Sequence, residues 1–367
     1  MKLQRYGLLA GVLAGSLALA ACGSDNTDTS GSGGGTSANS ADCASGTLQM
    51  QGSSAQGPAM TAWIQAYQTK CSGANVNYTK SASGTGRTAF INKQNSLVGS
   101  DSALKEQQKT DADKRCSPGT AVDLPMVITP IAIGFNVSGV TKLTLTPSLI
   151  SQIFNGKITK WNDAAIAKAN AGVTLPATTI TTVHRSTDSG TTQNFTNFLV
   201  AQAKADWPYE AGQSWQAPGG QGAANSTQLA QVVKSTDGAI GYLDNTDAKK
   251  NSLAVVSIDT GSGGVDITTD SVSKAVEAAK SSATGQDIKL TIDYGLKAAG
   301  AYPAILATYE ITCTSGLPSD QAKLIKSFLT YTASDAGQQE VTKAGHYPLP
   351  ASLLTQVQQA VASLSAS

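Results

Sequence analysis

The sequence predicts an α/β protein with two lobes, each a mainly parallel sheet with flanking helices, and three observations support this. Between Thr47 and Arg115, short apolar segments, turns of small residues and helical segments follow one another three times. This alternation is typical of parallel sheets. Two long apolar segments, Leu124–Gly139 and Tyr302–Cys313, are suited to carry the chain from one lobe to the other and back. The length of 367 residues suffices for two hinged lobes.

We place the first lobe at residues 47–130 and 306–367, and the second lobe at residues 131–305. In the first lobe we expect strands at Thr47–Met50, Val76–Lys80 and Ser96–Gly99, and helices at Ala59–Lys70, Arg87–Gln94, within Ser100–Arg115, and at Ala322–Ala333, Ala336–Ala344 and Ala351–Leu364. In the second lobe we expect helices at Thr146–Trp161, Asp163–Asn170, Thr192–Ala205 and Ser226–Ser235, and strands at Thr179–Arg185 and Gly238–Leu243. Pro130 is expected to break the first long apolar segment.

Residues 1–21 have the features of a targeting signal rather than of a folded element. Lys2 and Arg5 precede an apolar segment, Gly7–Ala20, that is too short to span a bilayer comfortably. The segment ends in "LAAC", which resembles the lipobox of bacterial lipoproteins and implies cleavage before Cys22 and acylation of its thiol. An ordinary signal peptide with a coincidental cysteine is the alternative. Residues 22–46 lack apolar periodicity and predict a flexible tether, so we expect a lipid-anchored domain on the outer face of the cell membrane.

The charge of the chain argues against two classes of partner. Without Lys2 and Arg5, the 26 basic residues become 24, against 25 acidic residues. A nearly neutral chain without a basic run is a poor candidate for binding nucleic acid or an anionic membrane surface.

Cys43, Cys71, Cys116 and Cys313 remain after Cys22 is set aside, and an even number outside the cytoplasm favours two disulfides with three possible pairings. We pair Cys43 with Cys71, because Cys43 precedes the first strand and Cys71 closes the first helix. Cys116–Cys313 is then the second bond. The chain has no CxxC motif and only two histidines, which argues against a metal site or a redox pair.

Three turns share one chemistry, because each lies between a predicted strand and a predicted helix and is rich in serine, threonine and glycine. They are Gly52–Ser54, Ser83–Gly86 and Ser189–Thr191. Free N–H groups and the positive dipole end of a helix favour anions, and hydroxyl groups add further donors. For any one of these turns taken alone, an ordinary helix N-cap is the favoured explanation. Three together, with Arg185 leading into the last, favour an oxyanion site, since a guanidinium binds phosphate or carboxylate in bidentate fashion. A surface ion pair between Arg185 and Asp188 is the alternative.

Asp101 introduces an acceptor among these donors. A carboxylate repels a fully ionised oxyanion but accepts a hydrogen bond from one that retains a proton, as phosphate does at neutral pH and sulfate does not. The alternative role is an N-cap for a helix beginning at Ala103.

The sequence offers little support for catalysis or for a cofactor. There is no G-x-S-x-G motif and no Walker A motif. We expect His184 on a buried strand, His346 in a loop near the C-terminus, and Trp63 in the core. The interpretation is therefore a binding protein that is not an enzyme.

With these residues in place, the chain resembles the PstS family, the phosphate-binding lipoproteins of bacterial phosphate ABC importers. The segments that carry the resemblance are "GSSAQGPAMTAWIQAY", "VNYTKSASGTG", "LVGSDSAL", "IFNGKITKWND", "RSTDSGTTQNF", "GAIGY" and "YPAILATYEI". The resemblance implies the type II fold of periplasmic binding proteins, inorganic phosphate as ligand and a membrane permease as partner. It also implies a set of phosphate-binding residues: Ser54, the N–H of Ala55, Ser83, Asp101, Arg185, Ser189, Gly190 and Thr191. We expect a monomer without a cofactor.

Two positions depart from the family pattern. The first turn has Ser54–Ala55 where the family often has Thr-Phe, and the acid that many members place two residues after the arginine is replaced by Thr187, with Asp188 following. Other hypotheses are a receptor for arsenate or a phosphonate, a secreted phosphoester hydrolase, and an adhesin that retains only the fold.

Overall fold

A mixed β-sheet with helices on both faces organises the protein, which confirms the predicted α/β class. In place of the separate, mainly parallel sheet expected for each lobe, one sheet continues through both, and its central strands pair antiparallel. The computed structural model describes residues 43–365, which lie within a single compact unit, Ala38–Ser367. The predicted targeting signal and Cys22 lie outside the described residues. We call residues 43–130 and 306–365 the first region, and residues 131–305 the second region.

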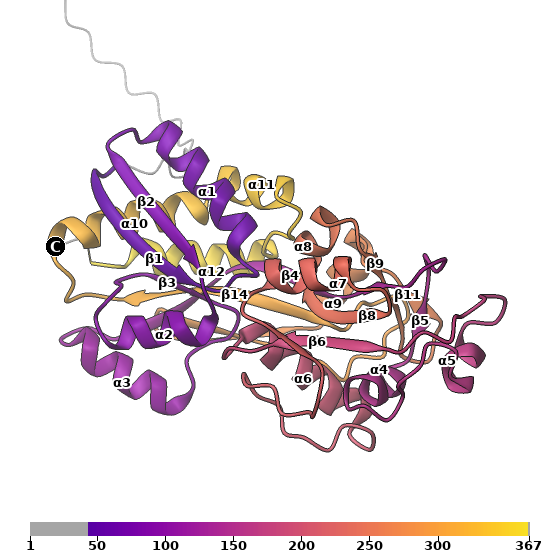
Figure 1. Cartoon of the computed structure of the whole chain (residues 1–367). Coiled ribbons are helices and arrows are strands. Elements are labelled where there is room, and N and C mark those ends of the chain that lie inside the picture. The colour runs from indigo at the N-terminus through magenta and orange to yellow at the C-terminus, as the bar shows by residue number, and fades with distance from the viewer. Residues whose placement is uncertain (1–42, 366–367) are drawn as a thin grey trace, which may run out of the picture. The chain divides into compact units, whose positions relative to one another are not determined.

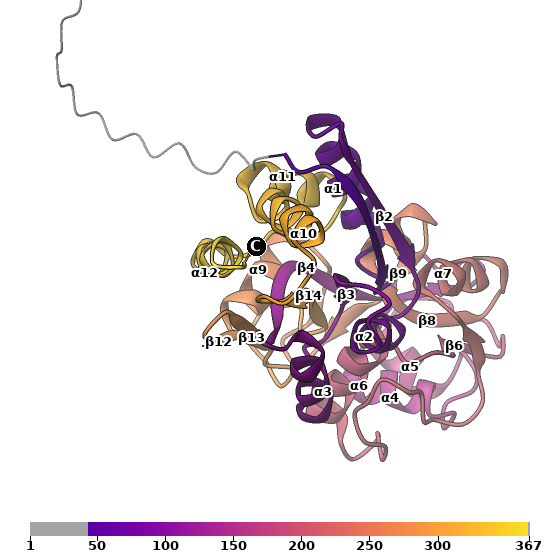
Figure 2. The same ribbon diagram turned by 90° about the vertical axis from the view of Figure 1, so that its left-hand side faces the viewer.

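The first region contains the strands β1 (Gly46–Gly52), β2 (Ala74–Lys80), β3 (Val98–Ser100), most of β4 (Ala121–Asn136) and nearly all of β14 (Ile305–Cys313). Its helices are α1 (Gly57–Lys70), α2 (Ser83–Ile91), α3 (Glu106–Cys116), α10 (Ser319–Thr332), α11 (Asp335–Lys343) and α12 (Ala351–Ala362). Figure 2 shows α10 and α2 on opposite sides of the strands of this region.

The second region contains strands of the same sheet, β6 (Thr181–Arg185), β7 (Gln221–Ala223), β8 (Ala239–Asp244) and β9 (Ala254–Val255). Its short strands are β5 (Thr144–Leu145), β10 (Ser257–Asp259), β11 (Gly264–Val265), β12 (Lys280–Thr284) and β13 (Asp287–Thr291). Its helices are α4 (Pro147–Phe154), α5 (Ala164–Ala169), α6 (Gly190–Ala203), α7 (Ser226–Ser235), α8 (Asn245–Lys250) and α9 (Thr269–Glu277).

Nine strands form the main sheet, in the order β2-β1-β3-β14-β4-β8-β6-β7, with β9 paired to β4 (Figure 1). The pairs at both ends of this order are parallel, whereas β14 and β4 pair antiparallel with their neighbours. Strand β4 pairs with β14 over Ala121–Pro130 and with β8 over Ile131–Asn136. Strand β4 therefore links strands of the two regions, whereas β14 pairs only with β3 and the first-region part of β4. The exact division into lobes stays a prediction.

Pro130 does not break β4, contrary to the sequence prediction. It lies where the pairing partner changes from β14 to β8, and the N–H of Ile131 donates to the carbonyl of Ala304 instead. A proline lacks the N–H that a ladder needs, and this change of partner is a position where the missing donor is tolerated.

The helix predicted at Thr146–Trp161 is wrong beyond Phe154. The N-cap side chain of Thr146 accepts from the N–H of Leu149, but the helix ends before Asn155, and Gly156 has a φ of 79°. A left-handed glycine directly after a helix is a common way to end it. The β12–β13 hairpin was also not predicted; it packs against the first region, where Asp287 accepts from the N–H of Asp123 at 2.8 Å.

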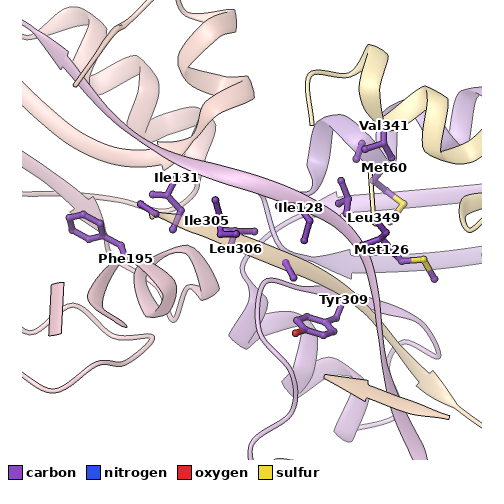
Figure 3. Close-up of a cluster of buried hydrophobic side chains, with 14 of the residues drawn as sticks. Met60, Met126, Ile128, Ile131, Phe195, Ile305, Leu306, Tyr309, Val341 and Leu349 are labelled. Carbon is purple, nitrogen blue, oxygen red and sulfur yellow. The ribbon is translucent and has the colours of Figure 1, made fainter. Parts of the chain in front are cut away.

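A continuous apolar core runs along the two long strands. Figure 3 shows Ile128, Ile131 and Leu306 between Met60 and Val341 at one end and Phe195 at the other, and all six are buried. Trp63 is fully buried and donates to the carbonyl of Gly337, which confirms its predicted place in the core.

Both predicted disulfides are present, Cys43–Cys71 and Cys116–Cys313. Within residues 43–365, no helix is long and apolar enough to cross a membrane. The same residues contain no group of three or more His, Cys, Asp or Glu arranged to hold a metal ion.

Candidate functional site

The three predicted turns lie where β1, β2 and β6 lead into α1, α2 and α6. The second turn, Ser83–Gly86, is itself the first turn of α2, so this helix begins earlier than the expected Arg87. Ser54 follows β1, Ser83 is the first residue of α2, and Ser189 is the N-cap of α6. The hydroxyl of Ser189 accepts from the N–H of Thr192 at 3.3 Å, so this residue is indeed a cap. Capping one N–H leaves the other free donors and the dipole of the helix end available for an anion.

All eight predicted site residues are buried, and several of their side chains bond across the two regions. These residues are Ser54, Ala55, Ser83, Asp101, Arg185, Ser189, Gly190 and Thr191. The guanidinium of Arg185 donates through Nη1 to the hydroxyls of Ser54 at 3.3 Å and Ser189 at 3.0 Å. The hydroxyl of Thr191 donates to Asp101 Oδ2 at 3.1 Å. The fold therefore brings together residues more than 80 positions apart that the sequence had selected separately.

Arg185 is held by neutral groups rather than by an acid. Its Nη2 donates to the carbonyl of Ala224 at 2.9 Å and to the hydroxyl of Thr187 at 3.3 Å. Asp188 accepts from Ser214 instead. The side chain of Arg185 is 2% exposed, so the alternative of a surface ion pair with Asp188 is wrong. Burial lowers the pKa of Arg185 from its very high ordinary value, and a guanidinium without a directly bonded acid leaves its charge available to a bound anion.

Asp101 lies opposite Arg185 and receives hydroxyl groups from both regions. Ser53 donates to Oδ1, Thr191 donates to Oδ2, and the N–H of Asp101 donates to the hydroxyl of Ser83 at 3.1 Å. Burial raises the pKa of Asp101, while the hydroxyl of Ser53 and the charge of Arg185 lower it. The alternative role as an N-cap is wrong, because the next helix begins at Glu106.

The two regions approach each other closely at Gly190 and Gly84. A Cβ at Gly190 would lie 2.5 Å from the Cβ of Asp101 and 2.7 Å from the hydroxyl of Ser83. The N–H of Gly84 donates to the carbonyl of Asp188 at 3.2 Å. Glycine at these positions allows backbones from opposite sides of the site to touch.

Three residues that were not among the predicted phosphate-binding residues complete the site, although one of them, Ser53, lies in the first predicted turn. Ser53 bonds Asp101, the side-chain amide of Asn194 donates to the carbonyl of Asp101 at 2.8 Å, and the N–H of Ser226 donates to the hydroxyl of Ser54 at 3.2 Å. Ser226 opens α7 behind the glycine-rich segment Ala217–Asn225, a fourth turn of the same kind. That composition was the signal available in the sequence.

Neither histidine bonds a serine or threonine of this site among the described residues. His184 is half-buried, which corrects the expectation of a buried position, and its ring stacks on Trp215 with 5.2 Å between centroids. His346 is buried, and its Nδ1 lies 2.8 Å from the hydroxyl of Thr129. Burial lowers the pKa of His346 to about 3, so it is neutral at physiological pH.

Comparison with known proteins places this geometry in a family. The model of the PBP superfamily domain matches residues 37–336. Phosphate-binding protein PstS 3 of Mycobacterium tuberculosis is 38% identical over 375 residues, covering 100% of both chains. The chain belongs to the PstS family. A more distant PstS, from Xylella fastidiosa, is 29% identical over 82% of this chain and 81% of its own length.

Solved structures share the PstS fold at low sequence identity. A high-affinity periplasmic phosphate-binding protein (PfluDING), solved with phosphate bound, superposes with a TM-score of 0.70 at 21% identity, over 86% of this chain and 93% of its own. The phosphate-binding protein of Stenotrophomonas maltophilia gives a TM-score of 0.66 at 20% identity, over 86% of this chain and 94% of its own. These similarities confirm the predicted periplasmic-binding-protein fold.

Proposed function

We propose that this chain is a receptor that binds inorganic phosphate outside the cytoplasmic membrane and delivers it to the permease of a phosphate ABC importer. The observation that carries the proposal is the burial of Arg185 and Asp101, one cation and one acid from different regions, within one network of hydroxyls from three helix-initiating turns. Full-length relatives named as phosphate-binding proteins support it.

The roles of the site residues follow from their chemistry. Arg185 would neutralise the anion, and the hydroxyls of Ser54, Ser83, Ser189 and Thr191 with the N–H groups of Ala55 and Gly190 would donate to its oxygens. Asp101 would accept the proton that phosphate retains. Sulfate offers no such proton, so its oxygen would face the carboxylate without a hydrogen bond and be repelled.

Ligand binding would favour closure of the two regions, because the complete set of groups exists only when both surround the anion. The closed form would then present the surface that the permease recognises. The predicted lipid at Cys22 would keep the receptor on the outer face of the membrane. The part of the predicted tether that precedes the disulfide-bonded Cys43 would let the domain reach the permease. No covalent step is required, and we propose that the protein is not an enzyme.

Calorimetric titration of the ligand-stripped domain that begins after Cys22 tests the proposal. We expect phosphate to bind and sulfate to give no heat at the same concentrations. A folded domain that does not bind phosphate would refute the proposal, and turnover of a phosphate ester that depends on Ser83 or Ser189 would favour the hydrolase instead. Delivery is tested by phosphate uptake in cells that carry the gene with and without Cys22→Ala.

A further inference from the structure

A second buried arginine lies behind Asp101 and was not selected from the sequence. Arg87 is one helical turn after Ser83 in α2, so both side chains lie on the same helix face. Its side chain is 0% exposed. Nη1 donates to the hydroxyl of Ser100 at 2.6 Å, and to the hydroxyl and the carbonyl of Ser102 at 2.8 and 3.3 Å. Arg87 therefore holds the residues immediately before and after Asp101.

Further bonds close this turn around Asp101. The hydroxyl of Ser100 donates to the carbonyl of Ser102 at 2.7 Å, and the N–H of Ser102 donates back to Ser100 Oγ at 3.3 Å. The N–H of Asp101 itself is bound to Ser83. The hydroxyl of Ser100, which Arg87 contacts, is therefore part of the turn that holds the backbone on both sides of Asp101.

The burial of Arg87 is unfavourable for the stability of the fold. Within the described residues its Nε and Nη2 have no hydrogen-bond partner, and it forms no ion pair at 4.0 Å or less. Burial lowers its pKa to about 10, so it remains charged at neutral pH. An unpaired buried charge costs several kcal/mol in general, and apolar residues of similar volume often stabilise a protein more.

We propose that Arg87 is a positioning residue that fixes the Ser100–Ser102 turn, so that Asp101 meets the ligand at one angle and distinguishes a protonated from a fully ionised oxyanion. The proposal rests on the proposed phosphate site and adds a residue that touches no ligand. Arg87 acts through the acid: if the turn is free, Asp101 can swing away from an oxygen that carries no proton, and the repulsion that excludes sulfate is lost.

The test is the ratio of phosphate to sulfate affinity, measured by calorimetry on the ligand-stripped mature protein. Arg87→Met keeps the length of the side chain and removes its donors and charge. We expect this variant to lower the ratio at least about tenfold, because hydrogen bonds to charged groups are worth roughly that factor or more. Arg87→Lys restores a cation that can reach Ser100 and Ser102, and we expect it to recover part of the ratio.

Arg115→Met is the matched control. Arg115 lies in α3 of the same region and donates to the carbonyls of Phe90 at 3.0 Å and Asn95 at 3.1 Å, away from Asp101. We expect Arg115→Met to lower the melting temperature and leave the ratio unchanged. A loss of stability alone is therefore not expected to lower the ratio of phosphate to sulfate affinity.

A second variant covers the case in which Arg87→Met fails to fold. Ser100→Ala combined with Ser102→Ala removes the two hydroxyls that Arg87 contacts and keeps Arg87 in place, and it should lower the ratio in the same direction. A wild-type ratio in this double variant, or in folded Arg87→Met, would overturn the inference. Absence of phosphate binding in the wild-type protein would instead refute the proposed function.

Discussion

The first region brings a carboxylate to the site, Asp101, whereas the second region brings a guanidinium, Arg185. Each region also brings hydroxyls from helix-initiating turns, Ser54 and Ser83 on one side and Ser189 and Thr191 on the other. Both regions therefore supply hydroxyl donors, but the negative charge comes only from the first region's Asp101 and the positive charge only from the second region's Arg185. This difference indicates that the second region attracts the anion and that the first region selects it, so affinity and selectivity should respond to different substitutions.

Arg185→Gln should have the largest effect on affinity. Glutamine keeps hydrogen-bonding capacity and removes the buried charge, and truncating one partner of a buried charged contact costs about 2–5 kcal/mol, so phosphate affinity should fall by about 30-fold or more. Titration calorimetry measures the effect. Arg115→Gln, which changes an arginine away from the site, should leave affinity unchanged; an Arg185→Gln protein with wild-type affinity would refute the assignment of charge to the second region.

Gly190→Ala should come next, because it keeps every charge and prevents the two regions from closing. The added Cβ would lie 2.5 Å from Asp101 Cβ, and overpacking of this kind costs about 1–3 kcal/mol, so phosphate should bind about 5- to 150-fold more weakly. Gly212→Ala is the control, because its nearest neighbour would be 3.8 Å away. Equal affinities of the two variants would show that close contact at Gly190 is not needed for binding.

Each region also buries an acid outside the predicted site residues. These two acids should make the free energy of unfolding depend on pH over a different pH range in each region. Burial raises the pKa of Asp123 in the first region to about 7, and that of Asp244 in the second to about 8. The folded protein holds these protons up to about pH 7 or 8, whereas the unfolded chain releases them near about pH 4. Their contribution to the free energy of unfolding is therefore complete below about pH 4. It falls as pH rises and is lost once pH passes about 7 for Asp123 and about 8 for Asp244. The buried His346 acts oppositely, but only below about pH 6.5.

Chemical denaturation in phosphate-free buffer measures this loss. Between pH 6.5 and 8, Asp244→Asn should remove up to about 2 kcal/mol of the fall in the free energy of unfolding. Asp123→Asn should remove only the smaller part that is complete near pH 7. Identical pH profiles for the wild type and both variants would contradict these assignments.

The disulfides should have the smallest effect on binding. Both join parts of the first region, Cys43–Cys71 and Cys116–Cys313, and neither touches the eight predicted site residues. Removal of one bond by paired Cys→Ala substitution should cost about 2–5 kcal/mol of stability and change phosphate affinity by less than about threefold. Thermal melting and calorimetry on the same samples give both values, and a large loss of affinity in a folded variant would contradict this separation.

The sequence predicted the turns and the two charges well, because each has a local signature. Ser54, Ser83 and Ser189 lie at strand-to-helix junctions that can be recognised from composition, and Arg185 ends an alternating strand. The partners of these residues could not be predicted in the same way. Asn194 reaches a carbonyl 93 residues away, and Ser226 meets Ser54 across 172 residues, and such contacts depend on the packing of whole elements.

Pro130 and Arg87 differ from what the sequence predicts, and each difference has a simple physical cause. Pro130 was expected to break a strand, but it lies where β4 changes partners, so the sheet does not need its missing N–H at that place. Arg87 was overlooked because a basic residue in a helix is usually solvated, and only the structure shows it fully buried behind Asp101. Its spacing of four residues from Ser83 was the available hint.

The central claim is that Asp101 selects the anion by accepting its proton, and Asp101→Asn tests this most directly. An amide carries no charge and can donate a hydrogen bond, so we expect the variant to bind sulfate, which the wild type excludes. The ratio of phosphate to sulfate affinity should fall at least about tenfold, measured by calorimetric titration of both proteins with both anions. An unchanged ratio, or a wild-type protein that binds sulfate as well as phosphate, would contradict the account.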